Sequence, residues 1–149
     1  MSIEIIIPLK PVTKKNSQKI ARNPYTGQSF ITQGDVYRKY EREAVRYLQK
    51  NYAPIKIDYP VNVRCMYYMP TRRTVDLVNL LEATCDVLVH ASILKDDNCS
   101  IIVGHDGSRV LYDKDNPRTE IFIESVENLE GIVFIPSRKQ RGTPPAESG

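Results

Sequence analysis

The sequence lacks the features that mark secreted and membrane-spanning chains. Its only apolar opening, Ile3–Pro8, is too short for the apolar region of a secretory signal, and lysines follow it rather than small residues. No apolar run approaches the length of a membrane span, and there are no internal repeats. We therefore expect a cytoplasmic protein with no membrane partner.

Cysteine is also scarce. The chain has three, Cys65, Cys85 and Cys99, which are odd in number and widely spaced. No Cys-x-x-Cys or Cys/His pair is present, and this argues against a zinc site. Because their neighbours are mostly apolar, we predict that the three cysteines are reduced and buried, which fits a cytosolic protein.

Acidic residues are absent from Ile5 to Gly34, although the whole chain carries a formal net charge of only +3. The cations of this acid-free stretch are Lys10, Lys14, Lys15, Lys19 and Arg22. A block of one sign is typical of a phosphate-binding surface and also of a solvated loop, so both interpretations stay open. The turn signal Asn23–Gly27 predicts an irregular loop from Val12 to Thr32, and loops of this length are usually functional or disordered.

The patterns that are present predict one α+β domain at residues 1–136, followed by a disordered polar tail at 137–149. Alternation and turn signals predict strands at Ile3–Ile7, Val61–Met69, Ser100–Val103, Arg109–Tyr112, Thr119–Ser125 and near Ile132–Ile135. Helical spacing predicts helices at Asp35–Asn51, with Asp35 as N-cap, and at Val75–Ala91, with Thr74 as N-cap. We expect a mostly antiparallel mixed sheet with two main helices, whose last strands form a meander.

The second predicted helix carries an apolar face and a polar column. The apolar face consists of Leu77, Val78, Leu81, Cys85, Leu88 and Val89. At about 100° per residue, Asn79, Glu82 and Asp86 fall within about 60° of one another, and Asp76 lies about 60° further round. The turn after the helix adds Asp96 and Asp97.

Carboxylates from the helix start and from the turn can converge if both fold onto one edge of the sheet. Converging oxygen ligands suit Mg²⁺, which lowers the pKa of a bound water and stabilises the leaving oxygen when a phosphodiester is cut. Structural interpretations remain open beside this one. Asp76 can simply favour the helix dipole, Asp96-Asp97 can form an Asx turn, and His105-Asp106-Gly107 is typical of a polar hairpin turn.

At these residues the chain resembles the RusA family of Holliday junction resolvases. The motif segments are Met69-Pro70-Thr71-Arg72-Arg73, Asp76-Leu77-Val78-Asn79-Leu80, Asp86-Val87-Leu88 and Leu94-Lys95-Asp96-Asp97-Asn98. The prolines Pro8 and Pro11 and the pair Asn16-Ser17 also fit the start of the family. The similarity covers roughly Ile3 to Glu124 and is most specific from Thr71 to Asn98.

The resemblance implies a symmetric homodimer that uses Mg²⁺ to make paired incisions in a four-way DNA junction. The family's metal ligands carry over to Asp76 and Asp97, with Asp96 as a neighbour. We predict that Asn79 orients a ligand or a metal-bound water. The predicted DNA contacts are Arg72 and Arg73, from the resemblance, and Lys14, Lys15, Asn16, Lys19 and Arg22, from the basic N-terminal segment.

Two positions depart from the family pattern. Many relatives have Asp-x-Asp-Asn at the helix start, where this chain has Val78, and relatives often have Lys where it has Glu82. Because Glu82 shares the Asn79 side of the helix, we predict that it restores the lost charge, so that Asp76, Glu82 and Asp97 form the metal set. The alternative is a degenerate protein that binds junctions without cutting them. A third possibility is a small α+β protein with an unrelated partner.

Overall fold

The computed structural model describes residues 2–14, 18–127 and 133–136, which form two helices and seven strands. This α+β content confirms the predicted fold class. Within the described part of the chain, neither helix has the length and apolar character needed to cross a bilayer. The predicted tail at 137–149 lies outside the described residues, and residues 133–135 are not in a strand, contrary to the strand predicted near them.

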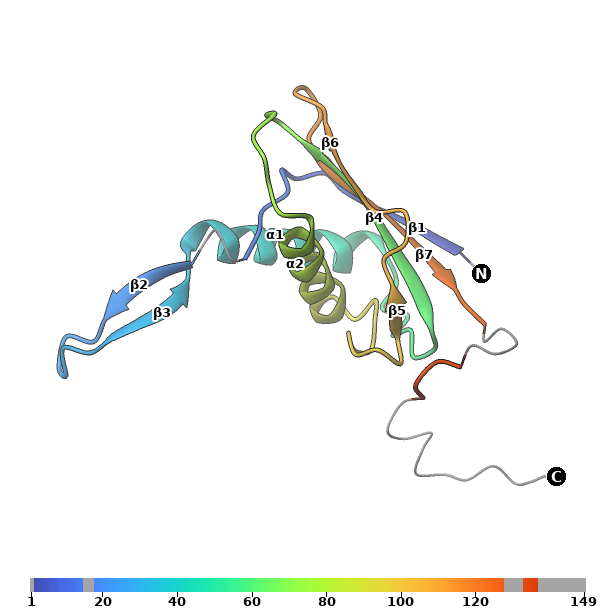
Figure 1. The fold of residues 1–149 in the computed structure, drawn as a ribbon, viewed down its shortest axis with the longest axis horizontal. Helices are drawn as coiled ribbons and strands as arrows, with labels where there is room; N and C mark the ends of the chain where they lie inside the picture. The colour runs from blue at the N-terminus through green and yellow to red at the C-terminus, as the bar shows by residue number, and fades with distance from the viewer. Residues whose placement is uncertain (1, 15–17, 128–132, 137–149) are drawn as a thin grey trace.

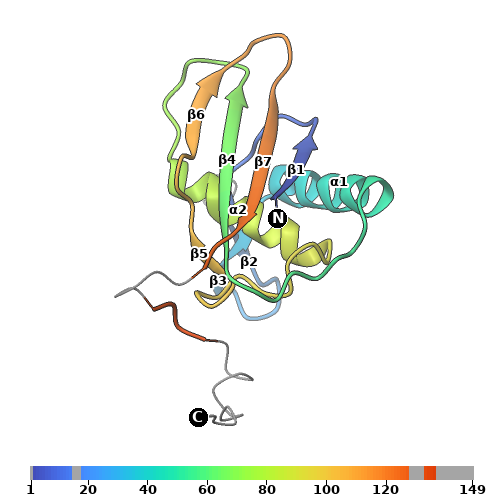
Figure 2. The same ribbon diagram turned by 90° about the vertical axis from the view of Figure 1, so that its right-hand side faces the viewer.

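A five-stranded sheet forms one layer of the molecule (Figure 2). Its strands are β1 (Ser2–Ile7), β4 (Val61–Met69), β5 (Ile102–Gly104), β6 (Arg109–Tyr112) and β7 (Arg118–Ser125). β7 pairs antiparallel with both β1 and β4, whereas β5 and β6 both run parallel to β4 along its other edge. The mixed sheet was predicted, but the meander was wrong, because β4 separates β6 from β7.

Two helices, α1 (Asp35–Asn51) and α2 (Leu77–His90), cover one face of this sheet (Figure 2). α1 has the predicted bounds, but its N-cap is Gly34 rather than Asp35. α2 begins two residues later than predicted because Asp76, not Thr74, is its N-cap: Asp76 Oδ1 accepts a hydrogen bond from Val78 N at 2.9 Å.

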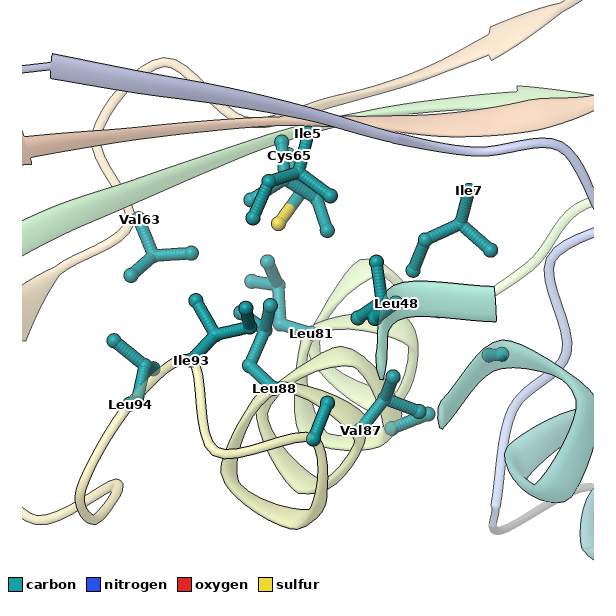
Figure 3. Close-up of a cluster of buried hydrophobic side chains, with 14 of the residues drawn as sticks. Ile5, Ile7, Leu48, Val63, Cys65, Leu81, Val87, Leu88, Ile93 and Leu94 are labelled. Atoms are coloured by element: carbon teal, nitrogen blue, oxygen red, sulfur yellow. The ribbon is translucent and has the colours of Figure 1, made fainter. Parts of the chain in front are cut away.

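The core lies between the sheet and the helices. Along β4, alternate residues are buried as the sequence predicted. Leu81 and Leu88 of α2 face Ile5 and Cys65 of the sheet (Figure 3). The buried residues of α2 that the predicted apolar face left out are Leu80, Ala83, Thr84 and Val87.

Two side chains lie differently from their predicted positions. Val78 was assigned to the apolar face of α2 but is 67% exposed. Cys99 was expected to be buried like the other two cysteines, yet it is exposed, whereas Cys65 and Cys85 are buried and all three are free thiols.

A hairpin replaces the predicted irregular loop near the N-terminus. Its strands, β2 (Gln18–Arg22) and β3 (Ser29–Gln33), pair antiparallel, and Figure 1 shows them extending away from the body of the molecule. The predicted turn at Asn23–Gly27 is confirmed as the tip, where Gly27 has φ of 75°. The strands were not predicted because neither QKIAR nor SFITQ alternates regularly between polar and apolar residues.

Candidate active site

The end of α2 directs the chain toward the acidic turn. Ser92, with φ of 62°, closes the helix: Ser92 N donates to Val89 O and Ile93 N donates to Leu88 O. The chain then pairs with a parallel segment, because Ile57 N donates to Ile93 O and Lys95 N donates to Ile57 O. These bonds fix the position from which the acidic turn starts.

Side chains within the turn hold it in shape. The Asp96 carboxylate accepts from Asp97 N at 2.7 Å and from Asn98 Nδ2 at 3.1 Å. Asn98 Oδ1 in turn accepts from Ser100 N and from Ser100 Oγ, at 3.0 and 2.6 Å. Asp96 and Asn98 therefore shape the turn, and the side chain between them, Asp97, lines a cavity.

This cavity, of about 510 Å³, lies between α2, the acidic turn and β5. Glu82 and Cys85 line it from α2, Asp97 lines it from the turn, and His105 lines it just after β5. The structure thus brings together Glu82 and Asp97, two of the three predicted metal ligands. Asp76 is not among the cavity-lining residues.

The electrostatic surroundings of Asp97 disfavour its negative charge. Partial burial raises the pKa of the Asp97 carboxyl, and the neighbouring carboxyl groups of Asp96 and Asp86 raise it further. A bound cation would relieve this repulsion. On the wall of the cavity, burial raises the pKa of the Cys85 thiol to about 12, so this cysteine is a neutral thiol at physiological pH.

Val78 also lines the cavity, one helical turn before Glu82. Its assignment to the buried apolar face was wrong, because Val78 is 67% exposed. Position 78 therefore borders the same space as Glu82 and Asp97.

Asp76 and Asn79 lie at the start of α2. The Asp76 side chain is exposed and caps the helix, the role that the sequence analysis had given to Thr74. Asn79 is half-buried in the first turn. Asp86, further along the same helix, forms an ion pair with Lys14 at 2.7 Å.

The donor set can be compared with what Mg²⁺ requires. Among the described residues, no group of three or more His, Cys, Asp and Glu side chains is close enough to hold a metal ion. Mg²⁺, however, keeps several waters and is usually held by one or two carboxylates together with substrate phosphates. Glu82 and Asp97 line one cavity, and the charge of Asp97 is disfavoured by burial and by Asp96 and Asp86. These two carboxylates therefore fit that mode of binding.

His105 also belongs to this site, although the His-Asp-Gly pattern indicates it only weakly. A break in the edge strand between β5 and β6 places it there: His105 Nδ1 donates to Val63 O at 2.8 Å, and Asn62 exchanges two hydrogen bonds with the backbone of Asp106. Since a carbonyl oxygen only accepts, Nδ1 carries the proton, and Nε2 lies 3.9 Å from Cys85 Sγ. These long-range contacts cannot be read from a His-Asp-Gly triplet, which is also typical of a simple turn.

The predicted DNA contacts come from two parts of the chain, the segment before α2 and the N-terminal segment. Arg72 and Arg73 are exposed, and the Arg72 guanidinium stacks on the ring of Tyr112 at 4.7 Å. Lys14 is engaged with Asp86, and Arg22 is exposed at the end of β2. Lys19 belongs to β2, whereas Lys15 and Asn16 lie outside the described residues.

Comparison with known proteins gives the class of the chain. Residues 8–124 match the family Endodeoxyribonuclease RusA, so the chain belongs to this family of DNA-cutting enzymes. A relative from Aquifex aeolicus (strain VF5) is named crossover junction endodeoxyribonuclease RusA. It is 29% identical over 96 residues, which span 64% of this chain and 72% of the relative.

Proposed function

We propose that this chain is a Mg²⁺-dependent, structure-selective endonuclease that resolves four-way DNA junctions by paired hydrolytic incisions. Family membership over residues 8–124 supports the class of reaction. The single observation that supports the proposed site is the cavity that Glu82, Asp97 and Val78 line together.

In this proposal Asp97 and Glu82 hold Mg²⁺ from the turn and from α2. Asp76, at the helix start, would be the third residue of the metal set. When bound, the ion supplies a more acidic water and a positive charge near the leaving oxygen. Asp96 keeps Asp97 in position through its hydrogen bond to Asp97 N. Asn79 orients a ligand or a water beside the acids.

The cations and the oligomeric state complete the proposal. Arg72 and Arg73, which are exposed just before α2, bind phosphates of the DNA. Lys14, Lys15, Asn16, Lys19 and Arg22 add contacts from the N-terminal segment. A homodimer is expected because a four-way junction offers two symmetry-related strands, and a two-fold protein can present one site to each.

The test measures cleavage of a labelled four-way junction with Mg²⁺ and with EDTA. Glu82→Gln should lower Mg²⁺-dependent cleavage by at least about tenfold, because it removes one of few oxygen charges. Glu43→Gln, which makes the same change at an exposed position on α1, is the matched control. Wild-type cleavage by Glu82→Gln would exclude Glu82 from the metal set, and absence of any cleavage by the wild type would contradict the proposed reaction.

A degenerate junction-binding protein is the second candidate function. It is favoured by one specific observation: this chain has Val78 at the position where the RusA pattern of the resemblance has an acid. This candidate predicts salt-sensitive binding of four-way junctions with no Mg²⁺-dependent cut. The same junction assay therefore separates the two functions.

A further inference from the structure

The β2–β3 hairpin has a root that lies beside the candidate active site. Lys14, just before the hairpin, pairs with Asp86 of α2 at 2.7 Å, and Asp86 lies one helical turn after Glu82. From this root the two strands extend away from the body of the molecule (Figure 1). The root of the hairpin therefore lies one helical turn from Glu82, which lines the candidate active-site cavity.

The tip of the hairpin is ordered by its own hydrogen bonds. Asn23 Oδ1 accepts from Tyr25 N at 2.8 Å and from Thr26 N at 3.3 Å, while Asn23 O accepts from Gly27 N at 2.8 Å. Thr26 Oγ1 accepts from Gln28 N at 3.3 Å. A tip that is ordered before binding loses less conformational entropy when a partner contacts it.

An aromatic ring stands on this ordered tip. Tyr25 is 95% exposed, the highest value among the exposed large apolar side chains of the described residues. Arg22 is exposed at the end of β2, next to the tip. A single exposed apolar residue needs no special explanation, but here the ring is combined with protrusion from the body and with nearby positive charge.

The charge of the hairpin indicates the chemistry of its partner. No acid occurs between Ile5 and Gly34, so the hairpin itself carries no negative side chain that would repel a polyanion. Cations that track a phosphate backbone, combined with an aromatic side chain that stacks on bases, are the usual means of binding exposed nucleotides. Two-stranded β-ribbons also serve as DNA-reading elements.

We propose that the β2–β3 hairpin is a DNA-binding arm and that Tyr25 at its tip stacks on a base exposed at the branch point of a junction. This inference rests on the proposed function, since a branched substrate supplies bases that a linear duplex keeps stacked between neighbours. It assigns to Tyr25 the choice of branched over linear DNA, separately from the cutting of the strand.

The test is binding without cleavage. Fluorescence anisotropy, in EDTA, compares a four-way junction with a linear duplex of the same sequence for wild type, Tyr25→Ala and Tyr25→Phe. Val133→Ala, at another exposed apolar side chain (80% exposed), is the control. Tyr25→Ala should weaken junction binding by about tenfold to a hundredfold and leave duplex binding unchanged, whereas Tyr25→Phe and the control should bind as wild type. Circular dichroism checks that each variant is folded.

A spectroscopic readout reports on stacking directly. Wild type should quench 2-aminopurine placed at the branch point, and Tyr25→Ala should quench it less. If wild type prefers the junction and Tyr25→Ala keeps that preference, the role of the hairpin is contradicted while the proposed function still stands. The role of the hairpin is also contradicted if Tyr25→Ala changes the oligomeric state by light scattering, because the tip then contacts a second copy. If wild type shows no preference for the junction, the proposed function fails and the arm with it.

Discussion

Asp97 and Asp76 were both predicted to bind Mg²⁺, yet they lie in different surroundings. Asp97 is presented to a cavity by a turn that Asp96 and Asn98 hold in shape, and partial burial together with neighbouring acids raises its pKa. Asp76 is exposed, and one of its oxygens already accepts from the backbone of the helix that it caps. Asp97 is therefore held at a cost that a cation would relieve, whereas Asp76 already has a structural role.

The largest expected effect comes from Asp97. Asp97→Asn should lower Mg²⁺-dependent junction cleavage by at least about a hundredfold, because it removes one of the two carboxylate charges that line the cavity. Binding of the junction in EDTA should be unchanged or slightly tighter, since no contact to phosphate is lost. A gel assay of single-turnover cleavage, with binding measured in parallel, checks both parts.

Asp115→Asn is the matched control for this change. It neutralises an exposed aspartate in the turn between β6 and β7, so its net-charge effect is the same. Equal loss of cleavage in both variants would mean that overall charge, not the cavity, governs the reaction.

Asp76 can be tested for ligation separately from capping. Asn is as good an N-cap as Asp, so Asp76→Asn should keep the stability of wild type while lowering cleavage by at least about tenfold. Asp76→Ala should lose cleavage and also about 1 kcal/mol of unfolding free energy. Urea unfolding and the junction assay measure the two effects. Wild-type cleavage by Asp76→Asn would show that Asp76 caps the helix and does not bind the metal.

Val78 offers a gain-of-function test of the cavity. Val78→Asp adds a third carboxylate to the space shared by Glu82 and Asp97, so Mg²⁺ should bind about tenfold more tightly in calorimetry. Val36→Asp on α1 is a close control, because Val36 is 66% exposed and Val78 is 67% exposed. Unchanged affinity in Val78→Asp would show that the cavity does not gather metal ligands.

Local patterns were sufficient to predict the elements that pack on the core. The bounds of α1 and β4 were predicted because their apolar residues recur at the period that buries one face. The hairpin was missed because its strands lack such a period. The parallel pairing of β5 and β6 with β4 was also missed, since pairing direction depends on contacts between residues that are far apart in the sequence.

The site divides in the same way. The RusA resemblance pointed to Asp97, and the helical spacing together with the departure at Val78 pointed to Glu82; the family match confirms the resemblance. The roles of these residues in metal binding stay predictions. His105 reaches the cavity because the segment between β5 and β6 is hydrogen-bonded to β4. The β4 residues that form these bonds are Asn62, Val63 and Cys65. No local pattern in the sequence encodes those contacts.

The smallest effect concerns stability and follows from the raised pKa of Asp97. A carboxyl whose pKa is higher in the folded than in the unfolded state makes folding less favourable at neutral pH, and this cost disappears below both pKa values. Asp97→Asn should therefore unfold at a slightly higher temperature than wild type at pH 7. The gain in unfolding free energy should be less than about 1 kcal/mol, because the group is largely solvated. The difference should vanish as the pH falls through the raised pKa and then the unfolded-state value.

Adding Mg²⁺ at pH 7 should stabilise wild type and not the variant, since a cation favours the charged carboxylate. Scanning calorimetry at two pH values measures all three changes, and a variant less stable than wild type at pH 7 would show that the Asp97 carboxylate has a structural partner rather than an open place for a cation.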